Sequence, residues 1–113
     1  MHTRLELSSQ GETTSKMRVT LVDWLIEVSE EFDLVPETTF LSVYLMDRYL
    51  RIDDISRKLL QLLGITSLYI AAKFEEIYVP RIDEFCDITD NTYTQEEVIG
   101  MERQVLQVVK FRI

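Results

Sequence analysis

Cysteine and histidine are scarce in this 113-residue chain, and their scarcity excludes several kinds of site. The one cysteine, Cys86, has no second thiol with which to form an internal disulfide, so we expect a reducing, intracellular compartment. The one histidine, His2, lies far from Cys86 in the sequence, whereas a zinc site needs several convergent donors of these types. We therefore predict no bound metal and no cofactor.

Long apolar runs and positive charge are also lacking. No stretch approaches the roughly 20 apolar residues that a membrane-spanning helix needs, and the polar residues 8–16 leave no apolar centre for a secretory signal. The chain carries 12 basic and 20 acidic residues, and its formal net charge of −8 repels a phosphate backbone. We expect neither a membrane nor a nucleic acid as a partner, and we expect the protein in the nucleus and cytoplasm.

The patterns that carry common enzyme chemistry are missing too. The chain has three glycines, and neither of the glycine-rich loops that bind phosphate is present in its sequence. The twelve-residue calcium-binding pattern with its central glycine is also missing. Nucleophilic catalysis by a serine or cysteine needs a histidine held in place as a base, and the one histidine, His2, lies in the predicted flexible lead. The sequence therefore predicts a protein that is not an enzyme.

What the sequence does contain is the apolar spacing of α-helices. In residues 17–32, apolar side chains such as Leu21 and Val28 recur at helical intervals. No segment alternates apolar and polar positions as a half-buried strand does. The apolar segment at residues 56–74 contains Gly64 and other small residues, which let neighbouring helices approach closely. We predict an all-α domain in which this third helix is the innermost.

Prolines and capping residues set the limits of the predicted helices. Pro36 and Pro80 suit turns or helix starts, because proline lacks the amide proton that a helix interior needs. The Ser56 hydroxyl is a plausible cap for the third helix, and Thr94 with Glu97 fits a capping box. We predict a flexible lead at residues 1–16 and a five-helix domain at 17–113, with helices at 17–32, 37–51, 56–74, 82–86 and from 94 onwards.

Three charged residues lie among apolar neighbours. Arg18 is near the start of the first predicted helix and Asp47 is in the middle of the second. A buried ion pair between them would account for both, because an unpaired buried charge is far costlier than a matched one. The alternative is two separately exposed charges. Lys73 lies at the end of the most apolar helix, where its ammonium group can donate to the backbone carbonyls of a partner.

Five short motifs, taken in order, resemble the cyclin family. They stand at residues 17–25 (MRVTLVDWL), 44–50 (YLMDRYL), 60–64 (LQLLG), 73–78 (KFEEIY) and 88–94 (ITDNTYT). Each motif is weak alone, but their order and spacing are specific, and the similarity to the first cyclin box of A-type and B-type cell-cycle cyclins covers residues 17–113. Glu27 and residues 73–78 look A-like, whereas residues 90–92 look B-like, and we favour type A.

The resemblance implies a five-helix cyclin box that binds and activates a cyclin-dependent protein kinase and so controls cell-cycle progression. In such kinases, a lysine–glutamate ion pair that helps to position the ATP phosphates forms when helix αC is pushed inward. By analogy with the family, Lys73 and Glu102 meet the kinase backbone and its αC region. The implied apolar contacts are Ile70, Phe74, Leu106 and Phe111, and the alternative for these four is core packing.

The resemblance also implies a groove that docks substrates or inhibitors containing an Arg-x-Leu motif. The groove residues are Met17, Leu21, Trp24, Glu27 and Gln61. The first three are spaced at i, i+4 and i+7, so they share one helix face, and the glutamate one turn further on suits the cation of the peptide. The sequence departs from the family at Thr20, where isoleucine is usual. The alternative is that this face is covered within the full protein.

Two further features bear on the resemblance: the absence of a second repeat favours an alternative function, and a short motif near the start is a candidate degradation signal. Cell-cycle cyclins usually carry a second helical repeat, which does not follow Ile113 in this sequence, and residues 4–7 match the start of a destruction-box motif. The alternative function is a non-activating interaction domain of the same fold, either a truncated cyclin or a transcription-type adaptor. A DNA-binding relative of the fold should be basic, so the net charge of −8 disfavours that relative.

Overall fold

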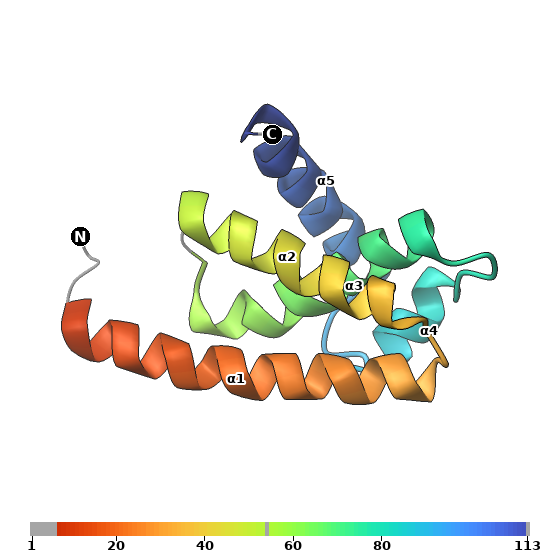
Figure 1. Ribbon diagram of the computed structural model, residues 1–113, viewed down its shortest axis with the longest axis horizontal. Coiled ribbons are helices and arrows are strands. Elements are labelled where there is room, and N and C mark those ends of the chain that lie inside the picture. The colour runs from red at the N-terminus through yellow and green to blue at the C-terminus, as the bar shows by residue number, and fades with distance from the viewer. Residues whose placement is uncertain (1–6, 54, 113) are drawn as a thin grey trace.

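Five α-helices and one short 3₁₀ helix make up the structure. The computed structural model describes residues 7–53 and 55–112, with side chains at 15–53 and 55–109. Within these residues there is no strand, and the prediction of an all-α, five-helix fold is confirmed. The elements are α1 (Leu7–Glu31), α2 (Pro36–Ile52), η1 (Arg57–Leu59), α3 (Leu60–Glu75), α4 (Ile82–Asp87) and α5 (Gln95–Arg112). Figure 1 shows α1 along the lower edge, with α2 and α3 above it and α5 rising away from them.

The central helix is α3. Every residue from 62 to 68 is buried, and α3 packs against η1 and all four other α-helices. Gly64 accounts for the close approach of α1, because a Cβ atom at this position would lie 3.0 Å from Cδ1 of Leu21. The prediction that the helix rich in small residues is the innermost is confirmed.

The short helix α4 is anchored to this core by one aromatic side chain. Phe85 is fully buried, and its ring meets those of Phe32 and Tyr69 in edge-on contacts with centroids 5.0 and 5.3 Å away. Such aromatic pairs add to the apolar area that is buried. The anchor fixes the point at which the segment between α3 and α4 returns to the body of the domain.

The first helix begins earlier than the sequence predicts. It starts at Leu7 instead of Met17, so the prediction of an unstructured lead is wrong for residues 7–16. Serine, threonine and glycine are weak helix formers, but once the apolar part at residues 17–31 has formed, each residue added upstream gains a hydrogen bond without a new nucleus. The predicted destruction-box start, from Arg4, lies outside the described residues except for the backbone of Leu7.

The predicted caps of α3 and α5 differ in outcome. The prediction of a Ser56 hydroxyl cap is wrong, because the 3₁₀ turn Arg57–Leu59 precedes α3 and the hydroxyl makes no capping hydrogen bond. The Ser56 carbonyl accepts a hydrogen bond from the Leu59 amide at 3.0 Å instead. The predicted capping box is confirmed. Thr94 Oγ1 accepts from the Glu97 amide at 3.1 Å, and Glu97 Oε1 accepts from the Thr94 amide at 2.8 Å.

Candidate functional site

An ion pair joins α1 to α2 and connects the first motif to the second. Arg18 Nε donates to Asp47 Oδ1 at 2.8 Å, and Arg18 Nη2 donates to Asp47 Oδ2 at 2.7 Å. The hydrogen bond to Asp47 raises the pKa of Arg18 above its ordinary value. The structure thus brings these residues together as expected, but the pair is not buried, since the two side chains are 42% and 32% exposed. It lies at the rim of the helix contact, where solvent screens the interaction.

A second ion pair joins α3 to α5. The Lys73 ammonium group donates to Glu102 Oε2, and its Nζ atom lies 4.4 Å from the centre of the Tyr69 ring. The Lys73 side chain is 41% exposed and that of Glu102 is 17% exposed. The two polar residues expected to face a kinase are therefore neighbours, and they contact each other in the unbound chain.

The apolar residues expected at the same contact have different environments. Ile70 is 1% exposed and belongs to the core, so it has almost no surface to offer a partner and we leave it out of the proposed contact. Phe74 is 72% exposed and Leu106 is 38% exposed. The side chain of Phe111 lies outside the described residues. The α3–α5 surface, defined as Lys73, Phe74, Glu102 and Leu106, combines one ion pair with two exposed apolar groups.

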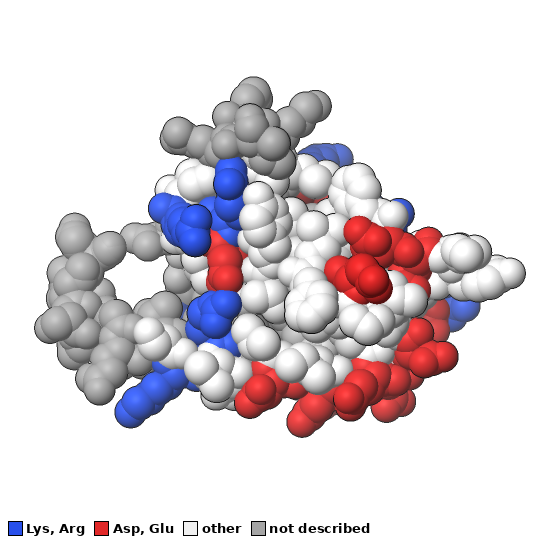
Figure 2. Space-filling model, viewed as in Figure 1, with Lys and Arg blue, Asp and Glu red and all other residues white. Residues whose placement is uncertain are grey.

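Two residues of the fourth motif, which were not named individually among the expected contacts, extend this surface. Ile77 and Tyr78 are each 89% exposed in the segment between α3 and α4, and we name this pair the tip. Figure 2 shows uncharged atoms projecting at the right, where Figure 1 places that segment. Large apolar side chains that water surrounds so fully are typical of a surface that another molecule covers. The available signal was the separate apolar run at residues 77–79, which follows two glutamates and ends at Pro80.

The expected docking groove lies along α1 where it meets α3. Met17 and Trp24 are half-buried, whereas Leu21 is only 8% exposed because its side chain rests on Gly64. Gln61, also half-buried, lies one turn before Gly64 on the same face of α3. The structure thus brings the apolar residues to one helix junction, and packing against α3 takes up most of the Leu21 side chain.

Acidic side chains border this junction. Four exposed carboxylates occur on the second half of α1, at Asp23, Glu27, Glu30 and Glu31. Figure 2 shows acidic residues gathered at the lower right, over that part of the helix. An approaching cationic side chain would be attracted to this edge. Glu27, the residue expected to receive the peptide's arginine, is therefore one of a group.

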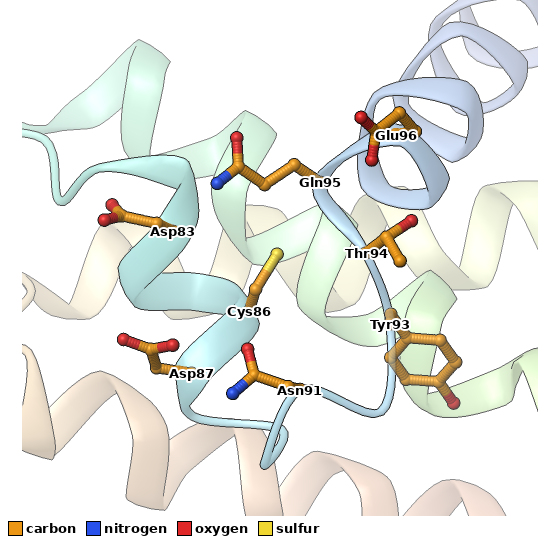
Figure 3. Close-up of a pocket in the computed structure, with 8 residues that line it drawn as sticks. All are labelled: Asp83, Cys86, Asp87, Asn91, Tyr93, Thr94, Gln95 and Glu96. Atoms are coloured by element: carbon orange, nitrogen blue, oxygen red, sulfur yellow. The ribbon is translucent and has the colours of Figure 1, made fainter.

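A separate pocket lies between α4 and the start of α5. Its volume is about 410 Å³, and Figure 3 shows the eight residues that line it: Asp83, Cys86, Asp87, Asn91, Tyr93, Thr94, Gln95 and Glu96. Burial, and then the neighbouring carboxylates, raise the pKa of the Cys86 thiol, so the nucleophilic thiolate is disfavoured. Across the part of the chain that the structure describes, no group of three or more potential metal ligands is found.

None of the described helices has both the length and the apolar character needed to cross a membrane.

Comparison with known proteins agrees with this arrangement. The family model described as the cyclin N-terminal domain matches residues 1–113. The chain is 56% identical to Cyclin-A2-4 of Arabidopsis thaliana over 105 residues, which are 93% of this chain and 23% of that protein. It is 57% identical to Cyclin-A1-1 of the same plant over 104 residues, which cover 92% of this chain and 23% of that protein. The chain thus spans about a quarter of the length of these curated relatives.

A solved structure gives the same result for the fold. The crystal structure of a viral cyclin from herpesvirus saimiri superimposes with a TM-score of 0.78 at 26% sequence identity. The match covers 83% of this chain and 41% of the viral protein. The A-type relatives agree with the type that the motifs favour. From the motifs, the five-helix fold and these matches together, we conclude that the chain belongs to the cyclin family and contains its N-terminal domain.

Proposed function

We propose that this chain is the kinase-binding part of a cyclin, a non-catalytic regulatory subunit that binds and activates a cyclin-dependent protein kinase. The observation that carries the proposal is the α3–α5 surface followed by the tip, which together combine four exposed apolar side chains with one ion pair. Fully burying a large apolar side chain contributes about 1.5–3 kcal/mol, so covering Phe74 and the tip would favour association strongly. A kinase helix αC held against this surface would be kept in its inward position, where the lysine–glutamate pair of the kinase forms.

Lys73 and Glu102 contribute to this contact by exchanging hydrogen bonds with each other for hydrogen bonds with the kinase. In the unbound chain each already has a partner, so a kinase backbone group that meets Lys73 shares or replaces the Glu102 carboxylate. We expect Lys73→Ala or Glu102→Ala to weaken kinase binding, because each leaves the other charge without its partner at the contact. Helix content should not change, because partly exposed ion pairs contribute only about 0.2–1 kcal/mol to folding. Loss of helix by circular dichroism would make these residues structural instead.

The most direct test substitutes two phenylalanines of nearly equal exposure. Phe74 is 72% exposed at the end of α3, and Phe40 is 74% exposed on α2. Phe40 follows the fully buried Thr38 by two positions, about 200° around the helix, so it points away from the core and α3. We expect Phe74→Ala to lower affinity for a purified cyclin-dependent kinase at least about tenfold, because it removes more than 1.4 kcal/mol of apolar burial. Phe40→Ala should leave the affinity unchanged. Equal loss in both variants, or in neither, would contradict the proposal.

Activation is tested separately from binding. The chain is added to the purified kinase, and the turnover of a peptide substrate is measured before and after the addition. We expect the turnover to rise as the complex forms. A complex with unchanged turnover would support the alternative, a non-activating cyclin-fold interaction domain.

We further propose that the α1–α3 junction docks Arg-x-Leu substrates or inhibitors. Half-buried Met17 and Trp24 leave part of their apolar surface available, and Glu27 is exposed beside them. Replacing Met17 and Trp24 together by alanine should abolish binding of an Arg-x-Leu peptide while sparing the kinase contact. Equal loss of both activities would indicate a misfolded variant. For a protein with these partners we propose a location in both nucleus and cytoplasm, to be checked by imaging a fluorescent fusion.

A further inference from the structure

The tip protrudes, yet its position relative to the domain is set by the residue before it. α3 ends at Glu75, and Glu76 has extended backbone angles of φ −99° and ψ 144°, so the chain leaves the helix axis there. The Glu76 amide still donates to the Ala72 carbonyl at 2.9 Å. Ile77 and Tyr78, which follow directly, are 89% exposed and therefore have little packing of their own. The direction of the tip depends on how Glu76 is held.

The Glu76 side chain binds the start of α2. Glu76 Oε2 accepts a hydrogen bond from the Val35 amide at 2.8 Å and another from the Thr38 hydroxyl at 2.5 Å. Val35 is the cap residue of α2 and has no polar side chain, so it cannot supply the acceptor that a serine or aspartate would. A carboxylate is also favoured at a helix N-terminus, where unpaired amides carry partial positive charge. Glu76 therefore caps a helix that begins about 40 positions earlier in the sequence.

We infer that Glu76 is a positioning residue for kinase binding, which holds the tip in its binding orientation by tying the end of α3 to the start of α2. This inference rests on the proposed kinase contact. The hydrogen bonds from Val35 and from the fully buried Thr38 tie the tip to a rigid part of the domain. Without these hydrogen bonds the tip samples other orientations. The apparent dissociation constant for the kinase then equals the intrinsic constant divided by the fraction of molecules whose tip is in the binding orientation.

The chain offers a matched control at the preceding position. Glu75 has the same side chain and is exposed, and it makes no hydrogen bond or ion pair with the residues that the structure describes. Glu76→Gln is a second control, because its amide oxygen can still accept both hydrogen bonds at Val35 and Thr38. Rescue by glutamine would separate the loss of the hydrogen bonds from the loss of charge.

The experiment measures the affinity of the 113-residue chain for a purified cyclin-dependent kinase by biolayer interferometry. We expect Glu76→Ala to weaken binding roughly tenfold, as follows if about one tenth of the tip population stays competent. Glu75→Ala should stay within about twofold of the parent chain, since it removes no contact. Glu76→Gln should restore most of the affinity. Circular dichroism should show the same helix content in all four proteins.

A double-mutant cycle tests whether Glu76 acts through the tip. In a background where Ile77 and Tyr78 are both alanine, the further change Glu76→Ala should have no effect, because there is no tip to orient. A tenfold loss that persists in that background would overturn the inference and assign Glu76 to general stability. Equal effects of Glu76→Ala and Glu75→Ala would overturn it as well. If the tip variant alone binds the kinase normally, the proposed contact at the tip is itself refuted.

Discussion

Two glycines in helices make a paired test of the packing between α1 and α3. Gly64 lies in α3 and Gly100 lies in α5, and in a helix interior alanine is more stable than glycine by about 1 kcal/mol. A Cβ atom at Gly100 meets nothing within 4 Å. A Cβ atom at Gly64 lies 3.0 Å from Cδ1 and 3.3 Å from Cγ of Leu21. The same substitution should therefore have opposite effects at the two positions.

The magnitude follows from these distances. Gly100→Ala gains the full propensity difference and should raise the free energy of unfolding by about 1 kcal/mol. Gly64→Ala gains the same amount but forces Leu21, which is only 8% exposed, to move against its neighbours. Overpacking of this kind costs about 1–3 kcal/mol. We expect Gly64→Ala to be less stable than Gly100→Ala by that amount, and no more stable than the parent chain.

Urea unfolding followed by far-UV circular dichroism measures the difference. A third variant, Leu21→Ala, removes the side chain that the new Cβ would meet, so in that background Gly64→Ala should become stabilising by about 1 kcal/mol. The displaced Leu21 should also weaken Arg-x-Leu peptide binding in the single variant. Equal stabilisation by the Gly64 and Gly100 substitutions would refute the reasoning, because it would show that α1 does not press on α3 at Gly64.

Three further predictions concern other contacts. Thr94→Ala should lower the free energy of unfolding by about 1 kcal/mol, because it removes the hydroxyl that accepts from Glu97, and thermal melts with Thr94→Ser as control check this. A double-mutant cycle on Arg18 and Asp47, both to alanine, should give a coupling of about 0.2–1 kcal/mol at this exposed site, and a value above about 2 kcal/mol would contradict the exposure of the two side chains in the structure. The raised pKa of Cys86 means that the unfolded chain loses its thiol proton first, so stability from this group is complete below about pH 8.5 and declines above it. Urea midpoints at neutral and alkaline pH, compared between the parent chain and Cys86→Ala, measure that decline, which should be smaller in the variant.

The helices with clear local signals could be predicted from the sequence closely. α2 was expected at residues 37–51 and is Pro36–Ile52, because Pro36 and the aspartate pair after Ile52 interrupt the apolar spacing on both sides. The start of α1 could not be predicted in this way. Helix growth is cooperative, so residues with weak propensity become helical when they adjoin a stable helix.

The site was only partly predictable, because exposure depends on the tertiary fold. Ile70 and Phe74 lie on the same helix one turn apart, yet one is 1% exposed and the other 72%. Their spacing along the helix cannot tell which of the two side chains neighbouring helices cover. The exposure of the tip could not be predicted for the same reason, since Ile77 and Tyr78 have side chains typical of a core and only the course of the chain after α3 exposes them.

Because α3 is central, this one helix also fixes the position of the two proposed binding surfaces relative to each other. Gln61 lies near its start, at the peptide-docking junction, and Phe74 lies near its end, on the α3–α5 surface. At about 1.5 Å and 100° per residue, the helix sets both the spacing of these positions, roughly 20 Å, and their relative angle around its axis. A docked substrate would therefore be held at a fixed distance from the kinase and in a fixed orientation relative to it. Inserting one residue into α3 would turn one surface by about 100° relative to the other.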